Sequence, residues 1–193
     1  GITGKAAPVI WTTTPWTIPA NTGISLNPNE EYVLTTDGYI VAKELHALSK
    51  EQGLFAGDVA QTFKATAFEN LNAINPLNGR ASRIVLGEHV LIDNGTGCVH
   101  TAPGHGEDDY RIGLIYDLEV VMPVDETGCF DETVVGLGLI PNAEEFVGKH
   151  IFKSNDALIE LMGDAVLKVS KFTHSYPHCW RSHTPLIFRA TRQ

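Results

Sequence analysis

The sequence predicts a mixed α/β domain with a β-barrel-like core of mostly antiparallel strands and peripheral helices. In the first half of the chain, apolar residues come mostly in short runs separated by turn residues, which is typical of strands. The pair Asp37-Gly38 lies between two of these runs and is typical of a tight hairpin turn. Only a few segments show the spacing of amphipathic helices. A mixed sheet or barrel with helices at its periphery fits this order.

Strands are predicted wherever a short apolar run is bounded by turn residues. They cover residues 6–11, 31–35, 39–42, 59–68, 82–86, 89–92, 98–102 and 166–173. Because Gly38 accepts a positive φ without cost, residues 35–42 are predicted to form a hairpin. The pair Pro103-Gly104 ends the strand before it, since a strand does not continue easily through this pair.

Helices are predicted where apolar residues recur at helical spacing. They cover residues 43–52, 107–118 and 155–162. The first ends at Gly53, a residue suited to the left-handed position after a helix. The second begins with three acidic residues, which the helix macrodipole favours in a first turn.

Length and composition indicate one globular domain over residues 1–193, because 193 residues compare with roughly 150 per domain. The first residue is not methionine and the last residues have no terminal character, so we expect a domain excised from a larger chain. No apolar run is long enough for a spanning helix or a signal peptide, so no membrane contact is expected. Cys98, Cys129 and Cys179 cannot all pair within the chain, which favours a reducing, cytoplasmic location.

The net charge is −9, which excludes a grip on nucleic acid by general phosphate neutralisation. Any nucleic acid would be held locally or by a partner. Two glycine-rich phosphate-binding motifs, the P-loop and the Rossmann fingerprint, are absent from the sequence, as is the Gly-x-Ser-x-Gly nucleophile elbow.

The first candidate site is the threonine segment, residues 11–21, in which four threonines and two tryptophans fall within seven residues. Threonine hydroxyls both donate and accept hydrogen bonds, so the cluster of Thr12, Thr13 and Thr14 could bind a sugar hydroxyl, an ester carbonyl or a water. An ordinary threonine-rich strand and turn is the alternative interpretation.

The second candidate site is the histidine segment, residues 95–110. Strand alternation places His100 on the same face as Cys98, and three acidic residues follow in the predicted helix. The acids could merely cap that helix, or one of them, such as Asp109, could pair with a substrate ammonium. A thiol catalyst is disfavoured, because His100 would have to reach its neighbour two residues away along a strand.

A zinc site in the C-terminal part of the chain is also disfavoured. Its candidate ligands are His174, His178, Cys179 and His183. These residues lack the paired spacing of structural zinc knuckles, so no metal and no cofactor are predicted.

Together, the two segments resemble the editing domain of isoleucyl-tRNA synthetases, the insertion called connective polypeptide 1 in class I synthetases. Both signature segments are present in the family's order, and residues 174–193 resemble the return segment toward the aminoacylation core. The sister valyl and leucyl enzymes usually have Ala-His-Asp where this chain has Gly104-His105-Gly106, which favours the isoleucyl branch. The signature motifs of aminoacylation are absent, so the fragment is expected to hydrolyse and not to charge tRNA.

The resemblance implies a role for each site residue. Asp109 would hold the α-ammonium of a misattached valine, while His100 and Trp16 would shape the side-chain pocket, with His100 blocking the extra methylene of isoleucine. The hydroxyls of Thr12, Thr13 and Thr14 would contact the terminal adenosine and the hydrolytic water, and Asn21 would support their turn. The general base stays open among His100, Asp109 and a ribose hydroxyl.

The implied activity is hydrolysis of valyl-tRNA specific for isoleucine, with valyl-adenylate as a further substrate, while isoleucyl-tRNA is excluded by size. A synthetic site cannot reject valine by more than roughly 1–3 kcal/mol, and isoleucyl-tRNA synthetase is a standard example of this limit. The implied partners are the 3′ end of this tRNA carrying valine, valine or its adenylate, and the remainder of the synthetase. The alternatives are a non-catalytic module that binds the aminoacyl-tRNA 3′ end and a metal-dependent hydrolase.

Overall fold

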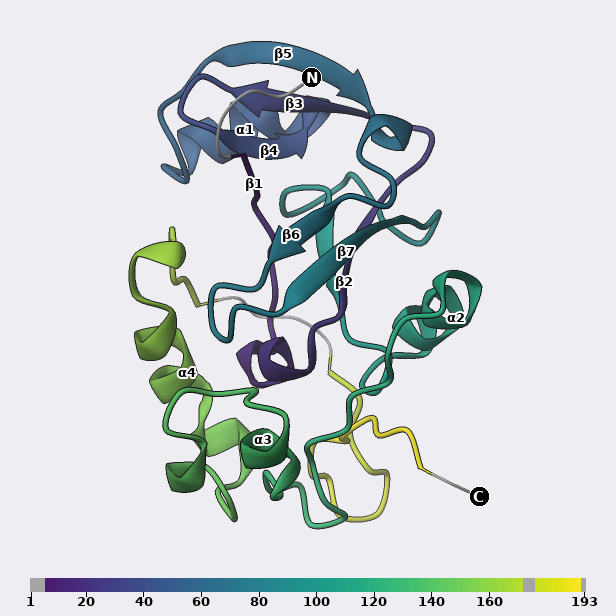
Figure 1. The fold of residues 1–193 in the computed structure, drawn as a ribbon, viewed down its shortest axis with the longest axis vertical. Helices are drawn as coiled ribbons and strands as arrows, with labels where there is room; N and C mark the ends of the chain where they lie inside the picture. Colours follow the sequence, from purple (N-terminus) through teal and green to yellow (C-terminus); the bar gives the residue numbers. More distant parts are fainter. Residues whose placement is uncertain (1–5, 172–175, 192–193) are drawn as a thin grey trace.

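The computed structural model describes residues 6–171 and 176–191, and it contains two four-stranded sheets with short helices packed around them (Figure 1). The first sheet has the order β1 (Ala7–Pro8), β4 (Tyr39–Ala42), β3 (Glu31–Thr35) and β5 (Val59–Lys64). The second has the order β6 (Asn72–Ile74), β7 (Ala81–Leu86), β2 (Gly23–Leu26) and β8 (Cys98–Thr101). Figure 1 shows the first sheet at the top of the molecule and the second below it.

The mixed α/β class and the mostly antiparallel pairing are confirmed, because only β1 with β4 and β2 with β7 pair in parallel. The prediction of a barrel-like core needs a correction, because within the described residues the two sheets do not close into a barrel. A buried cluster between the sheets explains this arrangement, since it takes residues such as Ile24 and Ile84 from one sheet and Tyr32 and Ile40 from the other. The sheets bury their apolar faces against each other instead of joining edges.

Several predicted strands are confirmed and others are wrong. The hairpin of β3 and β4 is present, with Gly38 at a φ of 92°, and β7 and β8 lie within one residue of their predicted bounds. The run 59–68 pairs only as far as Lys64, and the run 6–11 pairs only at β1. Residues 89–92 form a loop, and residues 166–171 contribute Leu167 to a small cluster without pairing any strand. Residues 172–173 lie outside the described part.

The four α-helices are α1 (His46–Glu51), α2 (Glu107–Tyr116), α3 (Thr133–Gly136) and α4 (Asn155–Met162), as far as the structure describes the chain. The helix predicted over residues 155–162 is confirmed. The helix predicted over residues 43–52 is present only from His46, because residues 43–45 form a 3₁₀ turn, η2 (Lys43–Leu45), that leads into α1. Gly53 then has a φ of 77°, as expected after a helix. The other 3₁₀ turns are η1 (Pro15–Ala20), η3 (Ala65–Ala67), η4 (Ala143–Glu145), η5 (Ile151–Lys153) and η6 (Gly163–Ala165).

The lower half of the molecule is built around a second buried cluster. Trp16 and Ile18 of η1 pack there against Val134 of α3 and Leu158 of α4. Figure 1 shows η1 lying between the second sheet and these helices. The turn η1 at the end of the threonine segment is therefore held in the apolar core, while residues 11–15 are not fully buried.

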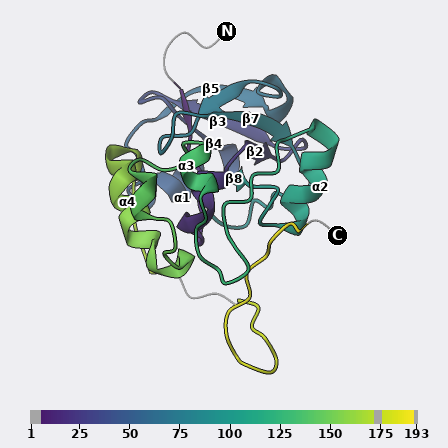
Figure 2. The ribbon, with the colours of Figure 1, turned by 60° about the horizontal axis from the view of Figure 1, so that its bottom comes forward.

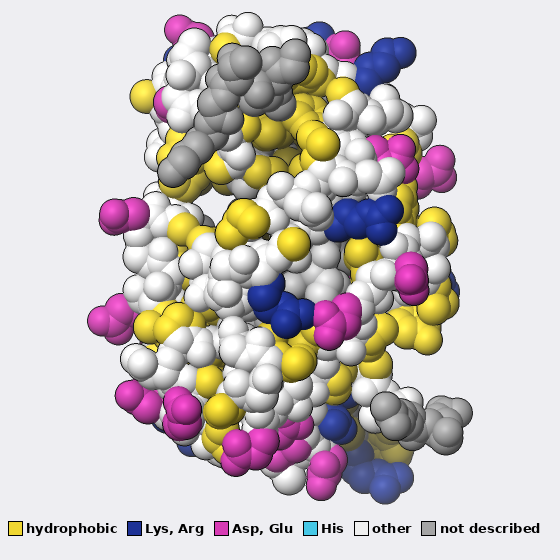
Figure 3. Space-filling view, in the orientation of Figure 1, with side chains coloured by type: hydrophobic (Ala, Val, Ile, Leu, Met, Phe, Trp, Pro, Cys, Tyr) yellow, Lys and Arg dark blue, Asp and Glu magenta, His cyan; other side chains and the backbone are white. Residues whose placement is uncertain are grey.

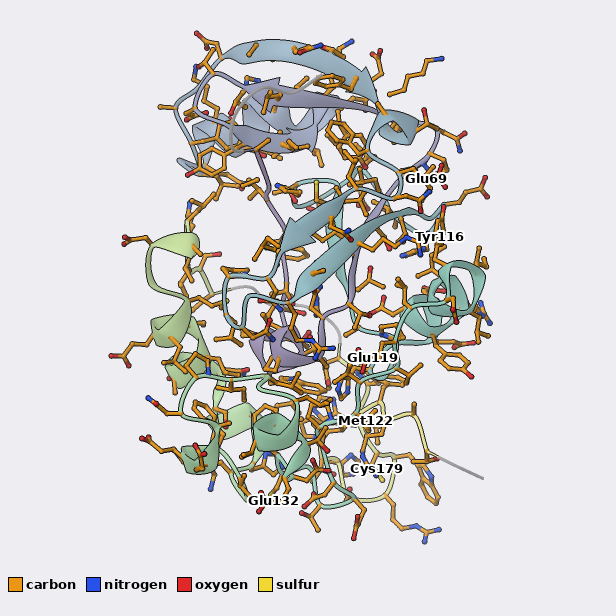
Figure 4. All side chains as sticks on the ribbon, viewed as in Figure 1. Glu69, Tyr116, Glu119, Met122, Glu132 and Cys179 are labelled. Carbon is orange, nitrogen blue, oxygen red and sulfur yellow. The ribbon has the colours of Figure 1, made fainter. Side chains whose placement is uncertain are left out.

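Helix α2 flanks the second sheet and is anchored at its C-terminal end. The hydroxyl of Tyr116 donates to Glu69 at 2.6 Å and accepts from the backbone N–H of Leu86 at 3.2 Å (Figure 4). The helix ends at Tyr116, two residues before the predicted end, because Asp117 takes the left-handed conformation.

The C-terminal segment, residues 176–191, projects as a loop in Figure 2 and then returns to the body of the molecule. Its backbone meets the histidine segment where Ala190 N–H donates to Gly104 O at 2.9 Å. Figure 3 shows Asp and Glu side chains along the lower part of one face, with Lys and Arg side chains scattered between other residues. Across the described residues, every helix is too short or too polar to cross a membrane.

Candidate active site

A pocket of about 280 Å³ lies where the threonine segment, β8 and the first turn of α2 meet. Its lining residues are Trp11, Thr12, Thr13, Thr14, Thr17, Val99, His100, His105 and Asp109. The pocket therefore brings the two candidate segments of the sequence together. Its volume lies just below the usual range for small-molecule sites, about 300–1,000 Å³, which suits a group of a few heavy atoms.

The threonine segment presents its hydroxyls to the pocket because of the turn that follows it. Pro15 begins the 3₁₀ turn η1, so Thr17 comes one turn after Thr14 and its Oγ1 donates to Thr14 O at 2.8 Å. The hydroxyls of Thr12 and Thr14 lie 3.3 Å apart, and Thr12 Oγ1 accepts the backbone N–H of Thr14 at 3.0 Å. The hydroxyls of Thr14 and Thr17 also lie 3.3 Å apart, so those of Thr12, Thr14 and Thr17 form one connected group.

His100 is held by two hydrogen bonds that define its tautomer. Its Nδ1 lies 2.8 Å from Asn21 Nδ2, and its Nε2 lies 2.8 Å from Thr17 Oγ1. Asn21 Nδ2 also donates to Gly23 O, so it is the amino group of the amide and His100 Nδ1 must accept. The proton of the neutral ring therefore lies on Nε2. Thr17 Oγ1 accepts a hydrogen bond from Nε2 and donates its own hydrogen to Thr14 O.

His100 is also electrically neutral. Burial, with a smaller contribution from His105, lowers the pKa of His100 to about 3. Since Nδ1 accepts from Asn21 and Nε2 carries a proton, neither nitrogen has a free lone pair in this arrangement. His100 is therefore a wall of the pocket and a hydrogen-bond donor, and it lacks the features of a proton acceptor.

Asp109 is the acid that turns inward. Glu107 pairs on the surface with Arg111 at 2.5 Å, whereas Asp109 lines the pocket and its Oδ2 accepts the backbone N–H of Ala102 at 2.9 Å. Burial raises the pKa of Asp109, and the bond from Ala102 opposes that rise. No hydrogen bond to its Oδ1 is found within the described residues, so this oxygen can accept from a ligand.

His105 forms the wall between the pocket and the buried cluster below. Its Nδ1 lies 3.1 Å from Phe188 O, so Nδ1 carries the proton and Nε2 keeps its lone pair. Burial lowers the pKa of His105 to about 4, so the ring is neutral. Its Nε2 is buried and has no hydrogen-bond partner in the part of the chain that the structure describes. The imidazole packs edge-to-face against Trp16 at 4.9 Å between ring centroids.

The structure places the predicted site residues in two groups. Thr12, Thr13, Thr14, His100 and Asp109 line the pocket. Trp16 is only 3% exposed and lies behind His105, and Asn21 lies behind His100, so both act on the pocket through a neighbour.

Other pocket residues were not assigned a role from the sequence: Trp11, Thr17, Val99 and His105. Thr17 could have been found from its three-residue spacing to Thr14, since residues three apart eclipse in a 3₁₀ turn. His105 carries no such signal, because its place depends on the C-terminal segment that supplies Phe188 O.

The alternative chemistries gain no geometric support. Cys98 is 1% exposed, its Sγ lies 3.7 Å from Ile40 O, and burial raises its pKa. Its thiol faces the core between the sheets, away from the pocket-lining residues. Among the described residues, no group of three or more His, Cys, Asp and Glu side chains could hold a metal ion. His174 lies outside these residues.

Comparison with known proteins identifies the family that this chain resembles. Residues 4–162 match the family model described as "Leucyl-tRNA synthetase, editing domain". The chain is 78% identical over 192 residues to an isoleucine–tRNA ligase of Sulfurimonas denitrificans and 66% identical over 193 residues to that of Sulfurovum sp.. Each match covers 100% of this chain and 21% of the relative, so the chain spans about a fifth of their length.

Solved structures share the fold at low sequence identity. The crystal structure of GlLeuRS-CP1 matches with a TM-score of 0.61 and 15% identity, over 83% of this chain and 82% of that one. A P. falciparum cytosolic leucyl-tRNA synthetase editing domain matches with a TM-score of 0.52 and 14% identity, over 81% of this chain and 67% of that one. These two similarities concern the fold alone.

Proposed function

Since this chain belongs to the family of the leucyl-tRNA synthetase editing domain, we propose that its pocket hydrolyses the ester of valyl-tRNA specific for isoleucine and excludes isoleucyl-tRNA by size. Membership of an editing-domain family implies a proofreading role and hydrolytic editing in general. The choice of valine as the rejected amino acid is our proposal, and it is supported by the high identity to isoleucine–tRNA ligases. Valyl-adenylate is proposed as a further substrate.

The observation that carries this proposal is the placing of Asp109 beside the threonine hydroxyls and His100. A misattached valine carries an α-ammonium, and Asp109 Oδ1 is an acceptor for it in a half-buried site where a charge-assisted bond is strong. The hydroxyls of Thr12, Thr13 and Thr14 can bind the terminal ribose and a water. An aminoacyl ester is already activated, so a positioned water suffices without a protein nucleophile.

Size exclusion rests on His100. The ring lines the pocket, its two nitrogens are held at 2.8 Å by Thr17 and Asn21, and it cannot yield without breaking buried hydrogen bonds. A wall held in this way can reject one additional methylene, which a flexible side chain would accommodate. We assign His100 the role of size gate for the amino-acid side chain.

The base that accepts the proton of the water is proposed to be a group other than His100. Of the alternatives that the sequence left open, Asp109 and a ribose hydroxyl of the substrate remain, and His105 Nε2 is added to them, because each has an available lone pair. Among these, His105 Nε2 is buried and has no hydrogen-bond partner within the described residues.

The remaining parts of the proposal concern the full-length enzyme. We propose that residues 1–193 form a single editing domain, that residues 174–193 lead back toward the aminoacylation core, and that the rest of the synthetase binds most of the tRNA. The 3′ end of the tRNA is then the only part that must enter the pocket, which is compatible with the net charge of −9. A cytoplasmic location stays a prediction.

The proposal is tested by incubating this 193-residue chain with valyl-tRNA and isoleucyl-tRNA, both on the isoleucine tRNA. We expect release of valine and retention of isoleucine. Saturable binding of a short aminoacyl-adenosine mimic with no rate gain, even at high enzyme concentration, would instead identify a passive 3′-end binding module. Loss of activity after chelation would support a metal-dependent hydrolase.

A further inference from the structure

Behind the pocket, a single chain of hydrogen bonds runs from β7 to the threonine segment. Ser82 Oγ donates to Asn21 Oδ1 at 2.6 Å, and Asn21 Nδ2 donates to His100 Nδ1 at 2.8 Å. His100 Nε2 then donates to Thr17 Oγ1 at 2.8 Å, and that hydroxyl donates to Thr14 O at 2.8 Å. Every donor in this series points the same way, so the orientation of each group depends on the one before it.

Ser82 begins this series and has no place in either candidate segment. It is 2% exposed in β7, and its hydroxyl supplies the one donor found for Asn21 Oδ1 among the described residues. If that donor were absent, the amide of Asn21 could turn over and present Oδ1 to His100 Nδ1. The ring would then carry its proton on Nδ1, and Nε2 could no longer donate to Thr17.

We propose that Ser82 is a positioning residue for the size gate: through Asn21 it holds His100 in the Nε2-protonated form and fixes the ring as a wall of the pocket. The expected effect of Ser82 on selectivity rests on the proposed function. The expected effect of Ser82 on the His100 tautomer does not depend on any activity. Two backbone carbonyls oppose the turning of Asn21 as well, because Gly23 O accepts from Nδ2 at 2.8 Å and Thr101 O accepts from it at 3.5 Å. Loss of Ser82 therefore weakens the arrangement without abolishing it.

The chain offers a matched control in the same sheet. Ser25 of β2 is 0% exposed, and its hydroxyl lies 2.7 Å from that of Thr101. It is thus a buried serine whose hydroxyl has a side-chain hydrogen-bond partner, as that of Ser82 has, but this partner is the hydroxyl of Thr101 and not Asn21 or His100. Ser82→Ala and Ser25→Ala remove the same atom at the same depth.

The first readout is selectivity. We expect Ser82→Ala to raise deacylation of isoleucyl-tRNA relative to valyl-tRNA by about tenfold, the effect of losing one buried hydrogen bond. Ser82→Thr, which restores the hydroxyl, should return the ratio toward that of the wild type, and Ser25→Ala should leave it unchanged. If Ser82→Ala does not fold, Ser82→Cys keeps the side-chain shape with only a weak donor and replaces it in the comparison.

The second readout is the ¹⁵N resonances of the His100 ring. The wild type should show a protonated Nε2 and an accepting Nδ1, whereas Ser82→Ala should show a mixture of both tautomers. Unchanged tautomer and selectivity in Ser82→Ala, or an equal change in Ser25→Ala, would overturn the assignment. If the wild type releases no valine, the proposed function fails, and the ring spectrum alone still decides the role of Ser82.

Discussion

Asn21 and His100 are 79 residues apart in the chain, yet their side chains meet at 2.8 Å inside the protein. Strand β2 brings them together, because Ile24 pairs with His100 in the antiparallel register of β2 and β8. Asn21 lies just before that strand. The contact thus links the threonine segment to the histidine segment, and it explains why the pocket-lining ring has one defined orientation.

Asp109→Asn is predicted to abolish deacylation of valyl-tRNA while the protein stays folded. The amide keeps an acceptor for Ala102 N–H but loses the charge that would hold the ammonium. The alanine variant is less informative, since it leaves the N–H of Ala102 unpaired and costs about 1–3 kcal/mol of stability. Single-turnover deacylation and thermal unfolding check both expectations.

Asp108→Asn is the control for that variant, because Asp108 lies in the same helical turn but on the surface, 3.8 Å from Arg111. It should retain full activity. Equal rates for the two variants would exclude Asp109 as the ammonium anchor.

His100→Ala is predicted to admit isoleucine. Removing the ring takes away one wall of the pocket, so isoleucyl-tRNA should be deacylated roughly 10–200-fold faster than by the wild type, the range for one methylene in a pocket. The measurement is the ratio of the two deacylation rates. His46→Ala is the control, because His46 contacts Gly57 and Phe55 at the other sheet. An isoleucyl-tRNA that survives His100→Ala would show that another residue sets the size limit.

Acid is predicted to destabilise the fold through its buried histidines. The pKa of His100 is lowered to about 3 and that of His105 to about 4, whereas an unfolded histidine takes up a proton near about 6.5. Below about pH 6.5 the unfolded state therefore binds more protons, and the free energy of unfolding falls by up to about 1.4 kcal/mol per pH unit for each histidine. The unfolding free energy stops falling for this reason once the pH drops below the folded pKa values, because the folded state then binds the protons as well.

Asp109 acts in the opposite direction in the same titration. Its pKa is raised, so the folded state takes up that proton first as the pH falls, and this uptake stabilises the fold. Urea unfolding at about pH 7.5 and about pH 5 measures the net slope. His100→Gln should remove the contribution of one histidine to the pH dependence of the unfolding free energy. An unchanged pH dependence would contradict the buried neutral state of His100.

Cys98→Ala is predicted to leave deacylation unchanged. The thiol is buried between the sheets and its raised pKa keeps it protonated, so it cannot act as a nucleophile. The cost should appear only in stability, at roughly 0.5–3 kcal/mol for a buried site. If the wild type showed burst kinetics and the folded Cys98→Ala variant did not, this result would support a thiol mechanism.

Sequence reasoning succeeded where local chemistry decides the outcome. The hairpin of β3 and β4 follows from the Asp37-Gly38 turn, and α4 follows from its helical apolar spacing. It failed for β2, which is fully buried along its four residues and shows no alternation. It also failed for residues 89–92 and 166–171, where apolar residues occur without a neighbouring strand edge to pair with.

Residue types alone identify the chemical groups of the candidate site, which are threonine hydroxyls, a strand histidine and a carboxylate in the first turn of a helix. The fold is needed to see that Asp109 turns inward while Glu107 stays outside, that Trp16 and Asn21 lie behind the pocket wall, and that His105 is part of this wall. The physical reason is that side-chain types are local, whereas burial, tautomer and hydrogen-bond direction depend on partners that the fold brings from distant parts of the chain.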